Sequence, residues 1–379
     1  MAEQEASQQF LTELEALRYE PYYYQEDNIL KSPYMPNPAL YKYLNLDPLF
    51  KQFRTNAESF REINKIAGRD LDNVKYCNFP MLNEITNGFK KENFIAKTLF
   101  GSLYRGTIVQ QGSRNRQVLV KTWDFYRTHS GVGNAYYAVY PSTFYAEIKL
   151  LLQKELGGHD NVVNMIGYCL EKKLAVIYDG KANKVLSQLL KSDNFDWDGR
   201  MKVALQLAKF LEWLHAKHII LGAISADSIL VDEEYNVAFF ELGLTKCVLD
   251  SRKGESTGGL KMSYAQFAAA EDKSGIADTW TCKSDVFAYG SVLSLLIRKE
   301  YYGNGNYSSA RAFALQDFKK NQILVNRDFQ VDEADAYQIT ELTLKCLEPD
   351  PDNRVDMGHV VHFLEQLALD HIAKKQKLN

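Results

Sequence analysis

Residues 219–243 read IILGAISADSILVDEEYNVAFFELG, and short apolar runs alternate with polar segments in this stretch. An apolar run at 219–221 leads into a short polar loop, and 229–231 then has the apolar, β-branched character of a buried strand. An acidic turn separates this strand from a second apolar run at 237–240, which ends in Glu241. The stretch therefore predicts a loop, a strand, a tight turn and a second strand with a carboxylate at its end.

The same stretch resembles the catalytic loop and metal-binding segment of protein kinases, in which an HRDxxxxN motif precedes DFG. On that pattern Ala223 stands in place of the catalytic aspartate, Ser228 in place of the asparagine and Glu241 in place of the DFG aspartate. In active kinases the catalytic aspartate accepts the proton of the substrate hydroxyl, and the other two residues hold Mg²⁺. An alanine cannot accept a proton, serine is a shorter and weaker ligand, and glutamate has one additional methylene. The resemblance therefore implies a pseudokinase, which is not an enzyme.

The size of these losses separates three interpretations of function. Losing the proton acceptor costs ~10²–10⁴ in rate, and displacing the metal-binding carboxylate by about 1 Å can cost ~10². We therefore expect an inert scaffold that binds other proteins. The alternatives are an atypical active serine/threonine protein kinase, in which Asp227 would have to replace the missing base, and a pseudokinase switch that responds to ATP.

The composition is that of a soluble globular protein and restricts the kinds of partner. The chain has 379 residues, 46% hydrophobic and 25% charged, and its net charge of −3 gives no indication of nucleic-acid binding. Its five cysteines are scattered without a CxxC pair, which argues against a disulfide framework and against a zinc site. No uninterrupted apolar run is long enough to span a bilayer. We expect a cytoplasmic protein with no bound metal and no membrane span.

The order of sequence patterns predicts an α+β, bilobal protein-kinase-like fold preceded by an extension. Residues 1–75 form the predicted N-terminal extension, helical in places and irregular across the Tyr/Pro-rich segment 19–50. The simpler interpretation is that the extension packs across the main domain, and the alternative is a docking surface for a partner. Residues 76–180 have the strand-rich pattern of a kinase-like N-lobe, and residues 181–373 have the helical pattern of a kinase-like C-lobe.

Residues 95–106 resemble the Gly-rich hairpin that lies over the ATP phosphates in active kinases. Ala96 and Thr98 replace the first two glycines of that hairpin, and only Gly101 remains. Side chains at the replaced positions would crowd the phosphates and stiffen the turn. The simple interpretation is a β-hairpin with no role in nucleotide binding.

A lysine and a glutamate are the one catalytic pairing that the resemblance retains. Lys121 ends an apolar strand pattern, and Glu147 lies in a predicted helix at the position of the ion-pair glutamate. Such a pair either fixes the helix on the sheet or contacts a nucleotide, and both roles remain open. Tyr178 occupies the gatekeeper position before the hinge. No cofactor is expected, and weak ATP or ADP binding would involve a vestigial site of Gly101, Lys121, Glu147, Tyr178 and Glu241.

Residues 159–171 (HDNVVNMIGYCLE) closely resemble a strand pair of the plant receptor-like kinase (RLK) and Pelle group, as does the helix pattern at 197–215. The resemblance also implies structural anchors in the C-lobe. Asp285 would hold the backbone of the catalytic loop, and Glu271 would pair with Arg354. Active and inactive kinases use these anchors alike, so they predict the fold and leave activity open.

Within that group the chain resembles the receptor-like cytoplasmic kinases, and among them the ZRK-type pseudokinases. That family implies an adaptor or decoy role in plant immune signalling. Its members bind coiled-coil NLR immune receptors and register pathogen effectors or modified partner kinases. We therefore expect a coiled-coil NLR immune receptor, another receptor-like cytoplasmic kinase or a pathogen effector as partner. We expect a cytoplasmic location, and peripheral attachment to the plasma membrane would occur through such partners.

Overall fold

The computed structural model describes most of the chain after the first 64 residues. The described residues are 65–66, 68–71, 73–98, 101–109, 114–123, 140–171, 173–180, 184–222, 224–243, 245–247, 255–256, 279–299 and 310–378. Most of the predicted N-terminal extension therefore lies outside the described residues, as do Ala223 and Glu271. The chain divides into two compact units, each described by itself: a strand-rich unit, Met1–Gly157 with Asn164–Gly180, and a helical unit, Gly158–Val163 with Lys181–Asn379.

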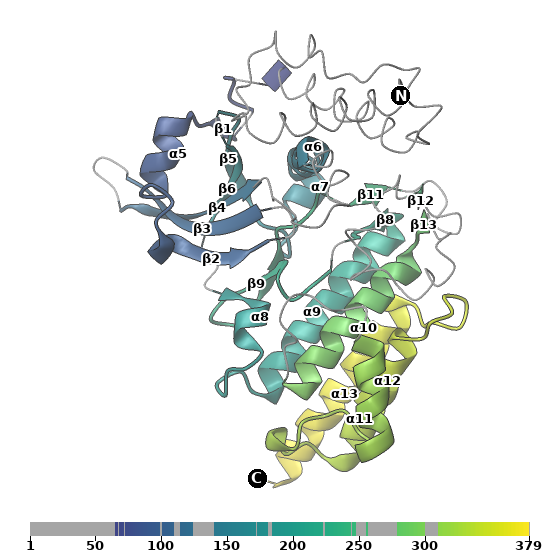
Figure 1. Cartoon of the computed structure of the whole chain (residues 1–379). Helices are drawn as coiled ribbons and strands as arrows, with labels where there is room; N and C mark the ends of the chain where they lie inside the picture. The colour runs from purple at the N-terminus through teal and green to yellow at the C-terminus, as the bar shows by residue number, and fades with distance from the viewer. Residues whose placement is uncertain are drawn as a thin grey trace, which may run out of the picture. The chain divides into compact units, whose positions relative to one another are not determined.

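A six-stranded sheet forms the strand-rich unit, in the order β1-β5-β6-β4-β3-β2 (Figure 1). Its strands are β1 (Lys75–Tyr76), β2 (Phe94–Lys97), β3 (Gly101–Ile108), β4 (Arg116–Trp123), β5 (Met165–Cys169) and β6 (Leu174–Asp179). Neighbouring strands pair antiparallel except β1 and β5, which are parallel. Strand β4 lies between β6 and β3, and its last six residues are all buried, as expected for a nearly continuous apolar run.

Helix α5 (Phe79–Ile85) covers one face of this sheet (Figure 1). Asn78 caps the helix, since its side-chain oxygen accepts the N–H of Met81 at 3.0 Å, and Pro80 lies in the first turn, where no backbone donor is needed. Leu82 is fully buried among apolar residues of β4, β5 and β6. Further helical segments in the described part of this unit include η1 (Lys91–Asn93), α6 (Tyr140–Leu151) and α7 (Lys154–Gly157).

Both edges of the sheet are short. Strand β1 has two residues, while β2 has four and its register with β3 shifts between Phe94 and Ala96. Next to β1, the hydroxyl of Tyr168 lies 2.7 Å from the carbonyl oxygen of Ile66 and 2.5 Å from that of Arg69. The chain that leads into the sheet is therefore tied to β5, beside the edge formed by β1.

The helical unit is built around two long helices. Its helices are α8 (Leu186–Leu189), α9 (Trp197–Ala216), α10 (Cys282–Arg298), α11 (Ala310–Asn321), η6 (Arg327–Phe329), α12 (Glu333–Cys346) and α13 (Met357–Leu378). Helix α10 is buried along nearly its whole length and contacts α9, α11 and α12, while α13 packs along α9 (Figure 1). The short strands are β7 (Lys184–Val185), β8 (Ile219–Ile220), β9 (Ile229–Val231), β10 (Val237–Phe239), β11 (Lys246–Cys247), β12 (Glu255–Ser256) and β13 (Thr279–Trp280).

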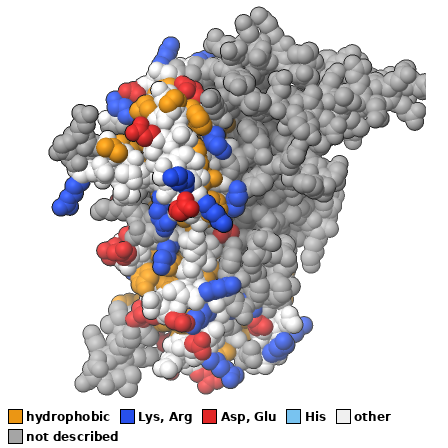
Figure 2. All heavy atoms as spheres, turned by 60° about the vertical axis from the view of Figure 1, so that its left-hand side comes forward, with side chains coloured by type: hydrophobic (Ala, Val, Ile, Leu, Met, Phe, Trp, Pro, Cys, Tyr) orange, Lys and Arg blue, Asp and Glu red, His pale blue; other side chains and the backbone are white. Residues whose placement is uncertain are grey.

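The structure confirms the predicted α+β organisation, with a sheet in the first unit and helices in the second. Helix α13 continues to Leu378, beyond residue 373 where the predicted C-lobe ends. Within the described part of the chain, no helix is both long and apolar enough to cross a lipid bilayer. On the face shown in Figure 2, acidic and basic side chains of the described residues are interspersed. This mixture agrees with the small net charge of −3.

Candidate functional site

A buried polar cluster joins the sheet of the strand-rich unit to helix α6. Lys121 of β4 and Glu147 of α6 form an ion pair with 2.6 Å between Nζ and Oε2, and both side chains are fully buried. The hydroxyl of Tyr178, on β6, donates a hydrogen bond to the other carboxylate oxygen of Glu147. The sequence analysis assigned these three residues to one site, and in the structure Lys121 and Tyr178 both contact Glu147.

Trp123 extends this cluster along the same face of β4. Because side chains alternate along a strand, Trp123 shares a face with Lys121, and its ring centroid lies 4.2 Å from the lysine ammonium. Its indole N–H donates to Oγ1 of Thr143 at 3.2 Å, and its ring meets Phe144 edge to face at 4.9 Å. Helix α6 is thus fixed to the sheet by charge, hydrogen bonding and aromatic packing. Sequence reasoning missed Trp123, although its place two residues after Lys121 was a usable signal.

The turn between β2 and β3 is closed by Thr98 and Gly101. The N–H of Thr98 donates to the carbonyl oxygen of Gly101, and the N–H of Gly101 donates to Oγ1 of Thr98, each at 3.0 Å. Phosphate-binding loops present backbone N–H groups to their ligand. In this turn the N–H of Gly101, the one remaining glycine of the Gly-rich hairpin, is already bound by the side chain of Thr98.

Asp285, in the first turn of α10, holds the loop that follows β8. Its carboxylate accepts the backbone N–H of Leu221 at 2.7 Å and that of Gly222 at 2.9 Å, and Nε2 of His215 lies 3.1 Å away. The Asp285 side chain is buried. Gly222 has a φ of +80°, in the left-handed region that glycine adopts without strain. Asp285 therefore fixes the backbone immediately before residue 223.

Two buried serines close the same loop further along. Oγ of Ser228 accepts the N–H of Ser225 at 3.0 Å and donates to the carbonyl oxygen of Ser225 at 2.9 Å. The N–H of Ser228 donates to that carbonyl at 3.1 Å. Such local bonds between a hydroxyl and the backbone are typical of serine in turns. Sequence reasoning compared Ser228 only with a metal ligand, and the three-residue spacing of the two serines was the signal that it missed.

Glu241 follows β10 at the end of a two-stranded ladder. Strands β9 and β10 pair antiparallel, with Val231 opposite Val237, so the predicted strand, turn and strand are present. Glu241 is buried, and its neighbours Phe240 and Leu242 are fully buried. Its carboxylate is therefore held inside the protein at the end of a strand.

Arg354 ties the loop after α12 to the start of α10. Its buried guanidinium donates to the carbonyl oxygens of Lys283 at 2.5 Å and Glu348 at 2.8 Å. The ammonium of Lys283 in turn donates to the carbonyl oxygen of Arg354. The predicted partner of Arg354, Glu271, lies outside the described residues.

Metal-binding side chains are not gathered in the described parts of the two units. There, no group of three or more His, Cys, Asp or Glu residues is placed to hold a metal ion. Burial raises the pKa of Cys77 to about 11 and that of Cys169 to about 12, so these thiols remain protonated at neutral pH. A protonated thiol is neither a metal ligand nor a nucleophile.

A comparison with protein families matches most of the chain. The family described as protein tyrosine and serine/threonine kinase matches residues 89–364. The matched segment begins shortly after α5 and ends within α13, so it includes the polar cluster and the loop held by Asp285.

Individual relatives agree with that match. The chain is 28% identical over 312 residues to the probable serine/threonine-protein kinase CST of Arabidopsis thaliana, which covers 78% of this chain and 71% of that protein. It is also 28% identical over 323 residues to the EPD1-interacting receptor-like cytoplasmic serine/threonine-protein kinase of Nicotiana benthamiana, covering 80% of this chain and 66% of that protein. A probable leucine-rich repeat receptor-like protein kinase of Arabidopsis thaliana is 28% identical over 322 residues, but only 32% of its length is spanned.

Proposed function

Because the chain belongs to the protein tyrosine and serine/threonine kinase family, we propose that it keeps the kinase fold without phosphoryl-transfer activity and acts by binding other proteins. It is a kinase-domain protein related to plant receptor-like cytoplasmic kinases. The proposal rests on one loop, residues 221–228. In this loop the hydrogen bonds that hold the backbone can be considered apart from the side chains that would take part in the reaction.

In this loop the backbone anchor is present and the reacting groups are replaced. Asp285 accepts two backbone N–H groups of the loop. Ala223 stands at the position of the catalytic aspartate and has no group that could accept the proton of a substrate hydroxyl. Oγ of Ser228, at the position of the metal-binding asparagine, makes hydrogen bonds with Ser225. The proposal therefore depends on one observation: Asp285 holds the backbone of the loop, while the side chains at the reacting positions are of other types.

The nucleotide and Mg²⁺ used by active members of the family fit these residues poorly. The N–H of Gly101 is accepted by Thr98, and Glu241 is longer by one methylene than the aspartate that holds the metal in active kinases. Lys121 and Glu147 are the residues that could still contact a nucleotide. We therefore propose weak ATP or ADP binding at most, and we assign the nucleotide no role in the adaptor function.

The proposed partners are proteins of plant immune signalling: a coiled-coil NLR receptor, another receptor-like cytoplasmic kinase or a pathogen effector. Two observations support this class of partner. The sequence resembles ZRK-type pseudokinases, and one relative is named as an EPD1-interacting receptor-like cytoplasmic kinase. With such partners the protein would act in the cytoplasm, and peripheral attachment to the plasma membrane would depend on them.

A phosphate-transfer assay with radiolabelled ATP and Mg²⁺ on the full chain tests the proposal. We expect the wild-type protein to label itself and a general acceptor protein no more than its Lys121→Ala variant does. The reference is the triple variant Ala223→Asp/Ser228→Asn/Glu241→Asp, which restores the three reacting groups. Since the proton acceptor alone contributes ~10²–10⁴ in rate, a gain in this variant shows that the assay detects transfer.

Transfer by the wild-type protein that Lys121→Ala abolishes would overturn the proposal in favour of an atypical active kinase. A second candidate function, a switch that responds to ATP, is favoured by the intact contacts among Lys121, Glu147 and Tyr178. A thermal-shift titration with ATP and Mg²⁺ separates it from the scaffold. A rise in Tm at low nucleotide concentration without transfer indicates the switch, whereas no rise, or a rise only at high concentration, agrees with the scaffold.

A further inference from the structure

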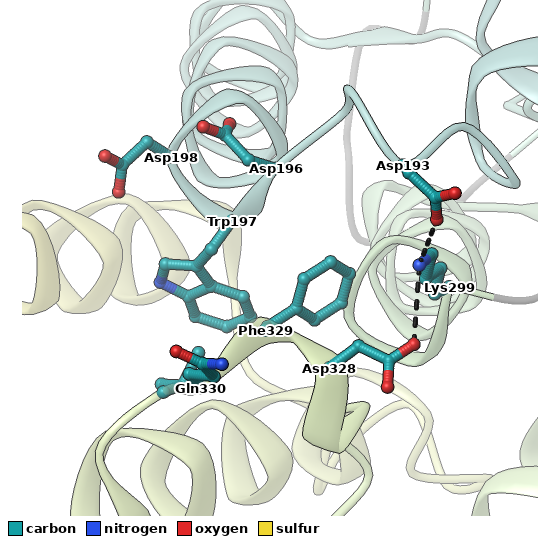
Figure 3. Close-up of a pocket in the computed structure, with 9 residues that line it drawn as sticks. Asp193, Asp196, Trp197, Asp198, Lys299, Asp328, Phe329 and Gln330 are labelled. Carbon is teal, nitrogen blue, oxygen red and sulfur yellow. Dashed lines mark hydrogen bonds and ion pairs between the residues drawn. The ribbon is translucent and has the colours of Figure 1, made fainter.

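A cavity of about 600 Å³ opens in the helical unit, where the loop before α9, the end of α10 and the segment η6 meet (Figure 3). Its volume is within the range of about 300–1,000 Å³ that is usual for small-molecule sites. Four of its nine lining residues are aspartates and one is a lysine, so it combines a hollow with a negative formal charge. None of the lining residues belongs to the loop or the polar cluster discussed above.

Two aromatic rings line the middle of this cavity. Trp197 is the first residue of α9 and Phe329 the last residue of η6, and their ring centroids lie 5.8 Å apart at an interplanar angle of 49°. Figure 3 shows Asp193, Lys299 and Asp328 grouped on the Phe329 side of the rings, while the carboxylate of Asp196 points away from both rings. Trp197 is only 7% exposed and Phe329 is half-buried, so the cavity offers mainly the Phe329 ring in its centre, with carboxylates at its sides.

Phe329 already receives a guanidinium within this protein. The buried guanidinium of Arg200 lies 4.7 Å from the Phe329 ring centroid and 4.5 Å from that of Phe195. Arginine is well suited to such contacts because its guanidinium is planar and weakly hydrated. The Phe329 ring is therefore of a kind that accepts a guanidinium in this protein. A second guanidinium in the cavity would be repelled by Arg200, so it would need the carboxylates there to offset that charge.

The carboxylates around the rings are held in place. Nζ of Lys299 lies 2.7 Å from Asp193 and 3.4 Å from Asp328, and the side chain of Asp196 accepts the N–H of Gly199 at 2.9 Å. The hydrogen bond and charge of Lys299 lower the pKa of Asp193, so that carboxyl remains ionised at neutral pH. One ammonium against four carboxylates leaves the cavity with excess negative charge.

We propose that this cavity binds an arginine side chain presented by an exposed segment of a partner protein. Its guanidinium would stack on Phe329 beside Trp197 and donate hydrogen bonds to Asp193 and Asp328. The negative charge disfavours an anion, and the described residues form no cluster suited to a metal ion. Lysine is a poorer fit because an ammonium has neither a planar face nor a fork of donors. This inference goes beyond the proposed function, since an active kinase could dock a partner in the same way.

Fluorescence anisotropy with the full chain and a labelled peptide, Gly-Arg-Ser-Arg-Gly, tests the site. We expect saturable binding that weakens about tenfold when citrulline, an uncharged analogue of arginine, replaces both arginines. The double variant Asp193→Asn/Asp328→Asn should weaken binding about five- to tenfold, because it removes two exposed carboxylates without disturbing the core. Raising the salt from about 0.1 M to about 1 M should also weaken binding, since the screening length falls from about 10 Å to about 3 Å.

The matched control is Glu341→Gln/Asp352→Asn, which removes two exposed acidic charges from the same unit outside the cavity. It should leave the affinity of the peptide unchanged. Equal weakening by both double variants, or equal binding of the citrulline peptide, would overturn the proposal and indicate general surface attraction. Removal of residues 374–379, which include three lysines, tests the chain itself as occupant. If the peptide binds more tightly after that removal, residues 374–379 of the chain itself occupy the cavity, and the proposal of a partner protein is overturned.

Discussion

The polar cluster of the strand-rich unit and the loop of the helical unit keep different parts of the kinase pattern. In the strand-rich unit the charged side chains themselves are present, and Lys121 and Tyr178 each bind Glu147. In the helical unit the anchor Asp285 is present, while under the proposed function Ala223 and Ser228 stand in place of the groups that would contact substrate and metal. On this proposal, the residues typical of kinases remain at positions where the side chain also stabilises the fold. At positions that would serve only the reaction, other residues are present.

Breaking the buried ion pair should have the largest effect. We expect Lys121→Ala to lower the free energy of unfolding by about 3–5 kcal/mol, because it leaves the carboxylate of Glu147 buried without its lysine. Urea denaturation followed by circular dichroism measures the change. The triple variant Lys121→Met/Glu147→Met/Tyr178→Phe should recover most of the loss, since it replaces both partners of the buried pair by apolar residues and also removes the hydroxyl that Glu147 accepted.

An exposed ion pair of the same unit supplies the control. Lys75 and Asp70 approach to 2.7 Å, but their side chains are 73% and 47% exposed. Lys75→Ala should therefore cost less than about 1 kcal/mol. Comparable losses for Lys121→Ala and Lys75→Ala would contradict a structural role for the buried cluster.

The anchor of the helical unit should come next. We expect Asp285→Ala to lower the free energy of unfolding by about 2–4 kcal/mol, because it leaves the buried N–H of Leu221 and the partly buried N–H of Gly222 without their acceptor. The same denaturation experiment measures it. Asp356→Ala, which removes an exposed carboxylate that accepts the N–H of His359, is the control and should cost about 1 kcal/mol. A smaller loss at Asp285 than at Asp356 would show that the loop does not depend on this anchor.

The smallest effect should be alike in the two units. Burial raises the pKa of Cys169 in β5 and of Cys346 in α12 to about 12 from an ordinary value of 9.0. Above pH 9 the unfolded chain loses these protons while the folded chain keeps them, so stability must fall as the pH rises toward 12. From pH 9 to about 10, each thiol should remove about 1 kcal/mol.

Denaturation at several pH values, with Cys169→Ala and Cys346→Ala compared with the wild type, measures each share. Each alanine variant should show a shallower decline over that range, whatever its stability at neutral pH. Unchanged slopes in both variants would mean that these thiols do not contribute to the alkaline loss of stability.

Much of the frame could be predicted from the sequence because it depends on apolar spacing and on local patterns. The runs at 229–231 and 237–240 form β9 and β10, and the lysine and glutamate singled out from the strand and helix patterns are in contact. The role described for Asp285 also corresponds to hydrogen bonds in the structure. Lys121 was signalled by an apolar run that ends in a lysine, whereas Glu147 and Asp285 were identified through the resemblance to protein kinases.

Features that depend on exchange of hydrogen bonds over a few residues were not foreseen. The mutual bonds of Thr98 and Gly101, and the turn between Ser225 and Ser228, could not be separated from ordinary loop sequence, because hydroxyl groups have several possible partners in a turn. The parallel pairing of β1 with β5 was missed for a different reason. Two residues are too few to show a strand period.

The brief edges of the six-stranded sheet have a consequence for how the protein behaves in a crowded solution. An open edge is a template on which another chain can add strands, and long flat edges promote aggregation. Here β1 offers two residues at one edge, and at the other the shifted register of β2 interrupts a regular ladder. The sheet therefore resists self-association by strand addition.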